Sequence, residues 1–129
     1  MLRTFQNYID KNKIQSSFVD DNRTMIEFTI DGLHFIFLYI VSDDPYYVRM
    51  LLPNAGQIDD ADPKIIKMLY DISRSYKVGK AFCYEGQIWF STESFVYSKE
   101  GADMLFQRMI SVLRDMFNHY RIYCDENKQ

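Results

Sequence analysis

Hydrophobic residues recur along this chain with two different periods, and the change from one period to the other predicts its secondary structure. Leu2, Phe5 and Ile9 follow steps of three and four residues, which is typical of a short amphipathic helix. The same period returns after Asp62-Pro63, an N-cap residue followed by a proline suited to the first helical position. The three helices are expected over about residues 1–12, 62–79 and 99–123.

Segments rich in β-branched and aromatic residues lie between these helices and predict strands. The expected strands are Ser17–Val19, Thr24–Ile30, Leu33–Val41, Tyr46–Leu52, Lys80–Tyr84 and Gln87–Thr92. The order is therefore α-β-β-β-β-α-β-β-α. Runs of strands joined by short turns indicate an α+β fold, in which an antiparallel sheet and its helices are segregated. No linker or repeat divides the chain, so a single domain over residues 1–129 is expected.

Two turns predict the register of the first strands. Asp31-Gly32 suits a two-residue hairpin that pairs Phe28 with Phe35. The connection Ser42–Pro45 then pairs Val41 with Tyr46 and Phe37 with Met50. Both turns place the same residues on one face, which is expected to pack against the helices. This core face comprises Ile26, Phe28, Ile30, Phe35, Phe37, Tyr39, Val48, Met50 and Leu52.

The opposite face of these strands is also largely apolar, although a face that simply met water would be polar. It carries Met25, Ile36, Leu38, Ile40, Tyr47 and Leu51, interrupted by Glu27, Thr29, His34 and Arg49. Trp89, expected to pair with Phe82 across the second hairpin and to be half-buried, is a further candidate anchor. Two explanations stay open: the patch binds a partner protein, or the first or last helix of the same chain covers it.

Composition narrows the classes of function. Of the 129 residues, 47% are hydrophobic and 16% aromatic, enough for one core. The net charge is −3 and the basic residues are dispersed, which argues against nucleic acid and anionic membranes as partners. The longest apolar run, Phe35 to Val41, is too short to span a bilayer, and the N-terminal residues do not resemble a signal peptide. Cys83 and Cys124 are expected to be thiols in a cytoplasmic protein.

No arrangement of residues predicts catalysis, a metal site or a cofactor. His34 and His119 are far apart in the sequence, and neither has a second ligand at zinc-site spacing. The glycines are isolated, and each of them, including Gly56 and Gly79, fits a turn or a helix cap, so they form no phosphate-binding loop. One alternative from a different class stays open: a small-molecule-binding or enzymatic domain with its pocket between the sheet and the last helix.

The segment from Ile72 to Val96, followed by the long last helix, resembles the YbjN-like family of small bacterial proteins. The resemblance rests on the order of elements and on Tyr76-Lys77-Val78-Gly79-Lys80, Glu85-Gly86 and Gln87-Ile88-Trp89-Phe90. The family often has an asparagine near the end of the middle helix, and here Ser73 and Ser75 flank that place. The resemblance implies a fold related to type III secretion chaperones. It also implies a non-enzymatic, chaperone-like or regulator-like protein that binds an unnamed protein client and often forms a homodimer.

Overall fold

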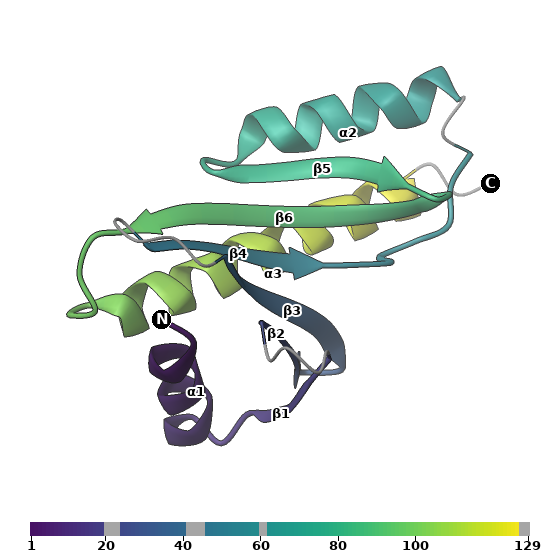
Figure 1. Cartoon of the computed structure of the whole chain (residues 1–129). Helices are drawn as coiled ribbons and strands as arrows, with labels where there is room; N and C mark the ends of the chain where they lie inside the picture. Colours follow the sequence, from purple (N-terminus) through teal and green to yellow (C-terminus); the bar gives the residue numbers. More distant parts are fainter. Residues whose placement is uncertain (20–23, 41–45, 60–61, 127–129) are drawn as a thin grey trace.

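The computed structural model describes residues 1–19, 24–40, 46–59 and 62–126 (Figure 1). Its elements follow the expected order, and their bounds are α1 (Leu2–Lys11), β1 (Gln15–Phe18), β2 (Met25–Ile30), β3 (Leu33–Ile40), β4 (Tyr46–Leu52), α2 (Pro63–Ser75), β5 (Gly79–Tyr84), β6 (Gln87–Val96) and α3 (Ala102–Glu126). The predicted α+β class with an antiparallel sheet is confirmed. Asp62 caps α2 as expected, because its side chain accepts a hydrogen bond of 2.9 Å from the Lys64 amide.

The strands form one 6-stranded sheet in the order β1-β2-β3-β4-β6-β5. The predicted register is confirmed where Phe28 pairs with Phe35 and where Phe37 pairs with Met50. Asp31 and Gly32 both have positive φ, 51° and 80°, as the two-residue hairpin requires. The predicted pairing of Val41 and the turn Ser42–Pro45 lie outside the described residues.

The second hairpin joins the sheet through β6, which pairs with β4 along its length from Phe90 to Val96. This strand is longer than expected, since the prediction ended it at Thr92. The added residues matter for the surface of the sheet. They place Phe95 opposite Tyr47, while the same pairing places Glu93 opposite Arg49.

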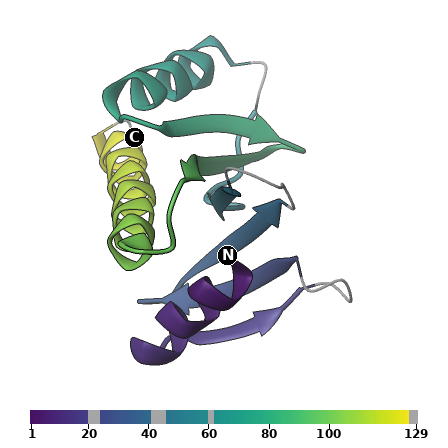
Figure 2. The ribbon, with the colours of Figure 1, turned by 60° about the vertical axis from the view of Figure 1, so that its left-hand side comes forward.

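All three helices contribute buried side chains to a single core on one face of the sheet, here called the inner face. The ring of Phe5 in α1 stacks on Phe37 of β3 at 3.9 Å and meets Phe106 of α3 edge-on at 5.0 Å. Figure 2 shows α2 and α3 side by side next to the strands. In the described part of the chain, no helix is both long and apolar enough to cross a membrane.

The bounds of two helices, α2 and α3, differ from the sequence prediction. α2 ends at Ser75, whereas the end was expected near Gly79, and Gly79 is instead the first residue of β5. The reason for glycine there is close packing, because a Cβ at Gly79 would lie 2.7 Å from the Met116 sulfur. α3 begins at Ala102 rather than Lys99, after Gly101 with a φ of 78°, and continues to Glu126.

Candidate functional site: the outer face of the sheet

The face of the sheet directed away from the helices, here called the outer face, has no described helix over it. In Figure 1 α3 passes behind β6, and Phe5 of α1 packs on Phe28 and Phe37 of the inner face. The explanation in which the first or last helix covers the outer face is therefore wrong for the described residues. Both helices lie on the other side of the sheet.

The register places the candidate binding residues together on the outer face. Met25, Ile36, Leu38, Tyr47 and Trp89 are partly buried, and none of them belongs to the core. Leu51 corrects the prediction in one respect. It lies on the outer face but is only 8% exposed. Its side chain therefore packs against its neighbours and presents little surface to a partner. The side chain of Ile40 lies outside the described residues.

Four aromatic residues outside the predicted binding set extend this patch, and of these only Phe82 was expected there, as the partner of Trp89. Phe82 and Tyr84 of β5 pack against Trp89, with ring centroids 6.3 and 5.5 Å away. Phe95 of β6 meets Tyr47 at 5.3 Å and is 57% exposed, and Tyr97 beyond it is 80% exposed. No local pattern identifies Phe95, because residues Thr92 to Val96 do not alternate between apolar and polar side chains.

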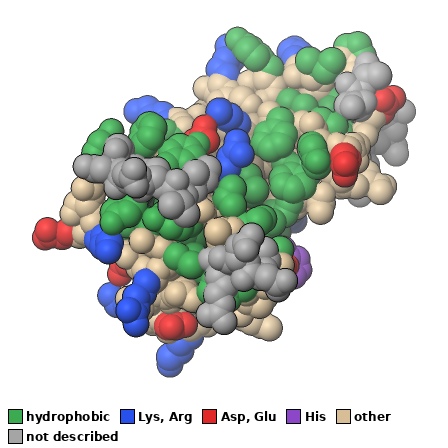
Figure 3. Space-filling model, viewed as in Figure 1, with side chains coloured by type: hydrophobic (Ala, Val, Ile, Leu, Met, Phe, Trp, Pro, Cys, Tyr) green, Lys and Arg blue, Asp and Glu red, His purple; other side chains and the backbone are tan. Residues whose placement is uncertain are grey.

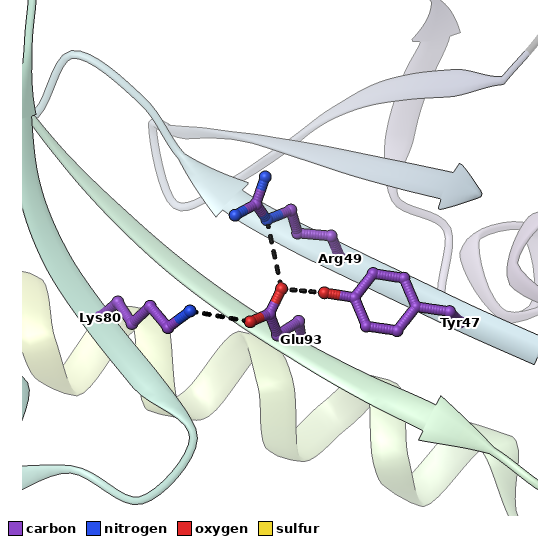
Figure 4. A network of polar contacts seen from close by, with 4 residues as sticks. All are labelled: Tyr47, Arg49, Lys80 and Glu93. Atoms are coloured by element: carbon purple, nitrogen blue, oxygen red, sulfur yellow. Dashed lines mark hydrogen bonds and ion pairs between the residues drawn. The ribbon is translucent and has the colours of Figure 1, made fainter.

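A polar cluster centred on Glu93 lies within the patch (Figure 4). The Glu93 carboxylate accepts a hydrogen bond from the Tyr47 hydroxyl and one of 2.9 Å from the Lys80 ammonium. Its Oε2 also faces the Nε atom of Arg49 at 3.6 Å. Three strands supply these four residues, and two cations surround one carboxylate.

The outer face is hollowed as well as apolar. An open hollow of about 390 Å³ is lined by Glu27, His34, Ile36, Pro53 and Asn54. In Figure 3 hydrophobic side chains gather over β4, β5 and β6 around a small group of charged ones. Such a surface can receive protruding apolar side chains of a partner. It also offers charged groups to the polar side chains of that partner.

The alternative prediction was a pocket between the sheet and the last helix. The structure has a packed interior in that place. Phe106, Leu113 and Met116 of α3 are fully excluded from solvent there. His34 is on the outer face, 3.1 Å from the Thr29 hydroxyl, whereas His119 lies on α3 beside Tyr76. In residues 1–19, 24–40, 46–59 and 62–126 no three His, Cys, Asp or Glu side chains are grouped to hold a metal ion. Cys83 and Cys124 are both free.

Comparison with solved structures relates this architecture to a known protein. The chain is similar to YbjN from E. coli, described as a proposed transcription regulator, with a TM-score of 0.62 and 12% identity. The match covers 95% of this chain and 93% of the YbjN chain. The chain has the YbjN fold. The resemblance expected from residues Ile72 to Val96 is confirmed at the level of the fold. No protein-family model and no curated protein matches the sequence.

Proposed function

We propose that the chain is a non-enzymatic, regulator-like module that binds a segment of another protein through the outer face of its sheet. The observation that carries the proposal is an apolar, aromatic sheet face that lies outside the core and has no described helix over it. Exposed apolar patches of this kind are typical of protein interfaces. The similarity to YbjN, itself described as a proposed regulator, supports the regulator-like class.

Two further features support a cytoplasmic location and a protein partner for this module. The free thiols of Cys83 and Cys124 suit the reducing cytoplasm. The net charge of −3 favours a protein partner over nucleic acid. A second copy of the chain is the other occupant of the outer face to be tested, because the resemblance to YbjN-like proteins implies frequent homodimers.

Leu38→Asp tests the proposal, with Gln107→Asp as the matched control. Leu38 is on the outer face, whereas Gln107 is exposed on α3. Leu38→Asp should reduce the fluorescence of an apolar dye bound to the native protein and abolish partner binding, while circular dichroism stays unchanged. Gln107→Asp should alter neither property. Affinity capture with the wild type and both variants, followed by reconstitution from purified components, measures the binding.

Three outcomes are distinguishable in this experiment. A purified partner that binds the wild type and Gln107→Asp but not Leu38→Asp supports the proposal. A wild-type molar mass of twice 15.4 kDa that Leu38→Asp halves assigns the outer face to a second copy instead. If Leu38→Asp or Phe95→Asp unfolds the chain, the outer face is internal core and the proposal is wrong.

A further inference from the structure

Arg49 lies at the centre of the outer face. It is opposite Leu38 on one side and opposite Glu93 on the other, because β4 lies between β3 and β6. Residues two positions away on the same strand share its face, so Tyr47 and Leu51 flank it along β4. One cation is thus flanked by the apolar and aromatic side chains of Leu38, Tyr47 and Leu51.

The guanidinium of Arg49 is only partly used by the protein. Its Nε atom is buried without a hydrogen bond and faces Glu93 at 3.6 Å. That ion pair is the only polar contact that Arg49 makes with the described residues. No described residue pairs with its two terminal nitrogens, and 36% of the side chain is exposed to receive a partner.

Glu93 approaches Arg49 only through the 3.6 Å ion pair with Nε and accepts no hydrogen bond from the terminal nitrogens. Its Oε1 atom is 2.9 Å from Lys80, and its Oε2 atom accepts the hydrogen bond from Tyr47. Figure 4 shows the terminal nitrogens of Arg49 directed away from this carboxylate. The cluster of Arg49, Lys80 and Glu93 also keeps one unbalanced positive charge.

An apolar segment that covered this position without an acceptor would desolvate a charged group and leave it unpaired, which is costly. A carboxylate removes that cost, because the fork of the guanidinium can donate two parallel hydrogen bonds to its two oxygens. Arginines surrounded by apolar contacts are frequent hot spots of protein interfaces. The chemistry of Arg49 thus restricts which apolar segments can bind.

We propose that the outer face binds an apolar protein segment that carries an Asp or Glu side chain, and that the terminal nitrogens of Arg49 hold that carboxylate. Glu93 positions Arg49, and Lys80 adds a second positive charge beside the site. Arg49 is therefore the residue that determines specificity, and this inference rests on the proposed function.

A peptide-display library of random dodecamers, selected on the immobilised full-length chain, tests the proposal. Peptides that also bind Leu38→Asp are discarded. The remaining sequences should combine apolar residues with one Asp or Glu at a constant position. In synthetic peptides with amidated C-termini, replacing that acid by Asn or Gln should weaken binding about 10- to 100-fold.

A double-mutant cycle then assigns the effect to Arg49. Arg49→Gln should lower the affinity for the acidic peptide to the affinity for its amide analogue. The affinity for the amide analogue should stay nearly unchanged. Arg49→Lys should retain only part of the preference, because an ammonium cannot donate the two-pronged bond. Circular dichroism and the unchanged binding of the amide analogue control for folding.

The results separate the two proposals. Leu38-dependent peptides without a constant acid, or acidic peptides that bind Arg49→Gln equally well, overturn the role of Arg49 and leave the outer face as a binding surface. Binding that requires a free C-terminal carboxylate also overturns the assignment to a side chain. If no Leu38-dependent peptide is recovered, both proposals are wrong.

Discussion

Tyr120, near the end of α3, shows how a single side chain is restricted by its surroundings. Its ring faces Phe90 of β6 at 6.1 Å, and its hydroxyl is so close to Gly56 that a Cβ there would overlap it. Burial, followed by a hydrogen bond with Cys124, raises the pKa of Tyr120 to about 12. The folded chain thus favours the protonated phenol.

Tyr120 should make stability depend on pH in the alkaline range. A folded-state pKa above the unfolded value near 10 stabilises the chain below pH 10, and this contribution is lost as the pH rises toward 12. Urea midpoints measured between pH 8 and pH 11 should therefore fall more steeply for the wild type than for Tyr120→Phe. Parallel curves for the two proteins would show that burial does not perturb this phenol.

Gly56 and Gly79 mark what residue-level sequence reasoning missed. From the sequence both were interpreted as turn or cap residues, because isolated glycines commonly serve there. Neither has a positive φ, and each instead lets a side chain of α3 approach closely, Tyr120 at Gly56 and Met116 at Gly79. A special role for these glycines was predictable, but its reason depended on two side chains of α3 that lie 37 and 64 residues further along the sequence, which no local pattern contains.

At the level of elements, α2 protects one edge of the sheet. β5 is the last strand beyond β6, and the other edge of an outer strand is open to pairing with foreign strands. Ser73 of α2 prevents this at one point, since its hydroxyl accepts a bond of 2.8 Å from the Ala81 amide and lies 3.2 Å from the Ala81 carbonyl. The helix thus supplies the partner that a seventh strand would otherwise provide.

Ser73→Ala should open this edge of the sheet. The loss of the contact with Ala81 is expected to cost about 1 kcal/mol of the free energy of unfolding and to accelerate amide exchange at Ala81 about fivefold. Ser75→Ala is the control, because its hydroxyl only donates to the Asp71 carbonyl within the same helix. Equal exchange at Ala81 in the two variants would contradict a protective role for Ser73.

The predictions for elements succeeded where a turn determined the geometry. Asp31-Gly32 defines a hairpin by itself, so the pairing of Phe28 with Phe35 followed from the sequence. β6 was expected to end at Thr92, because the residues beyond it gain their partners from β4, 44 to 50 residues earlier in the sequence. Pairing between distant strands has no local signal, so Glu93 and Phe95 were absent from the predicted site.

On the scale of the whole molecule, one core connects all the elements. Phe5 of α1 and Ile72 of α2 belong to the same buried cluster, although they lie at opposite ends of the sheet. The chain nevertheless exposes 8434 Å², against roughly 7,200 Å² expected for a compact monomer of its mass. An uncovered sheet face is consistent with this larger area.

A single core predicts a single cooperative unfolding transition. Trp89, the one tryptophan, reports on the β5–β6 hairpin by fluorescence, whereas far-UV circular dichroism reports on all the helices and strands. The urea midpoints from the two signals should coincide for the wild type. Separate midpoints would instead mean that the hairpin and α2 unfold independently of α1 and the first strands.

The sequence by itself determined the class, the order of elements and the two faces of β2, β3 and β4. These depend on periods of two and 3.6 residues and on short turns, which are local properties of the chain. Only the tertiary structure decided that the helices leave the outer face uncovered and that Glu93 stands beside Arg49, 44 positions earlier. Such neighbours result from burying the core as a whole. A different strand order could satisfy the same local patterns, and it would place another residue beside Arg49.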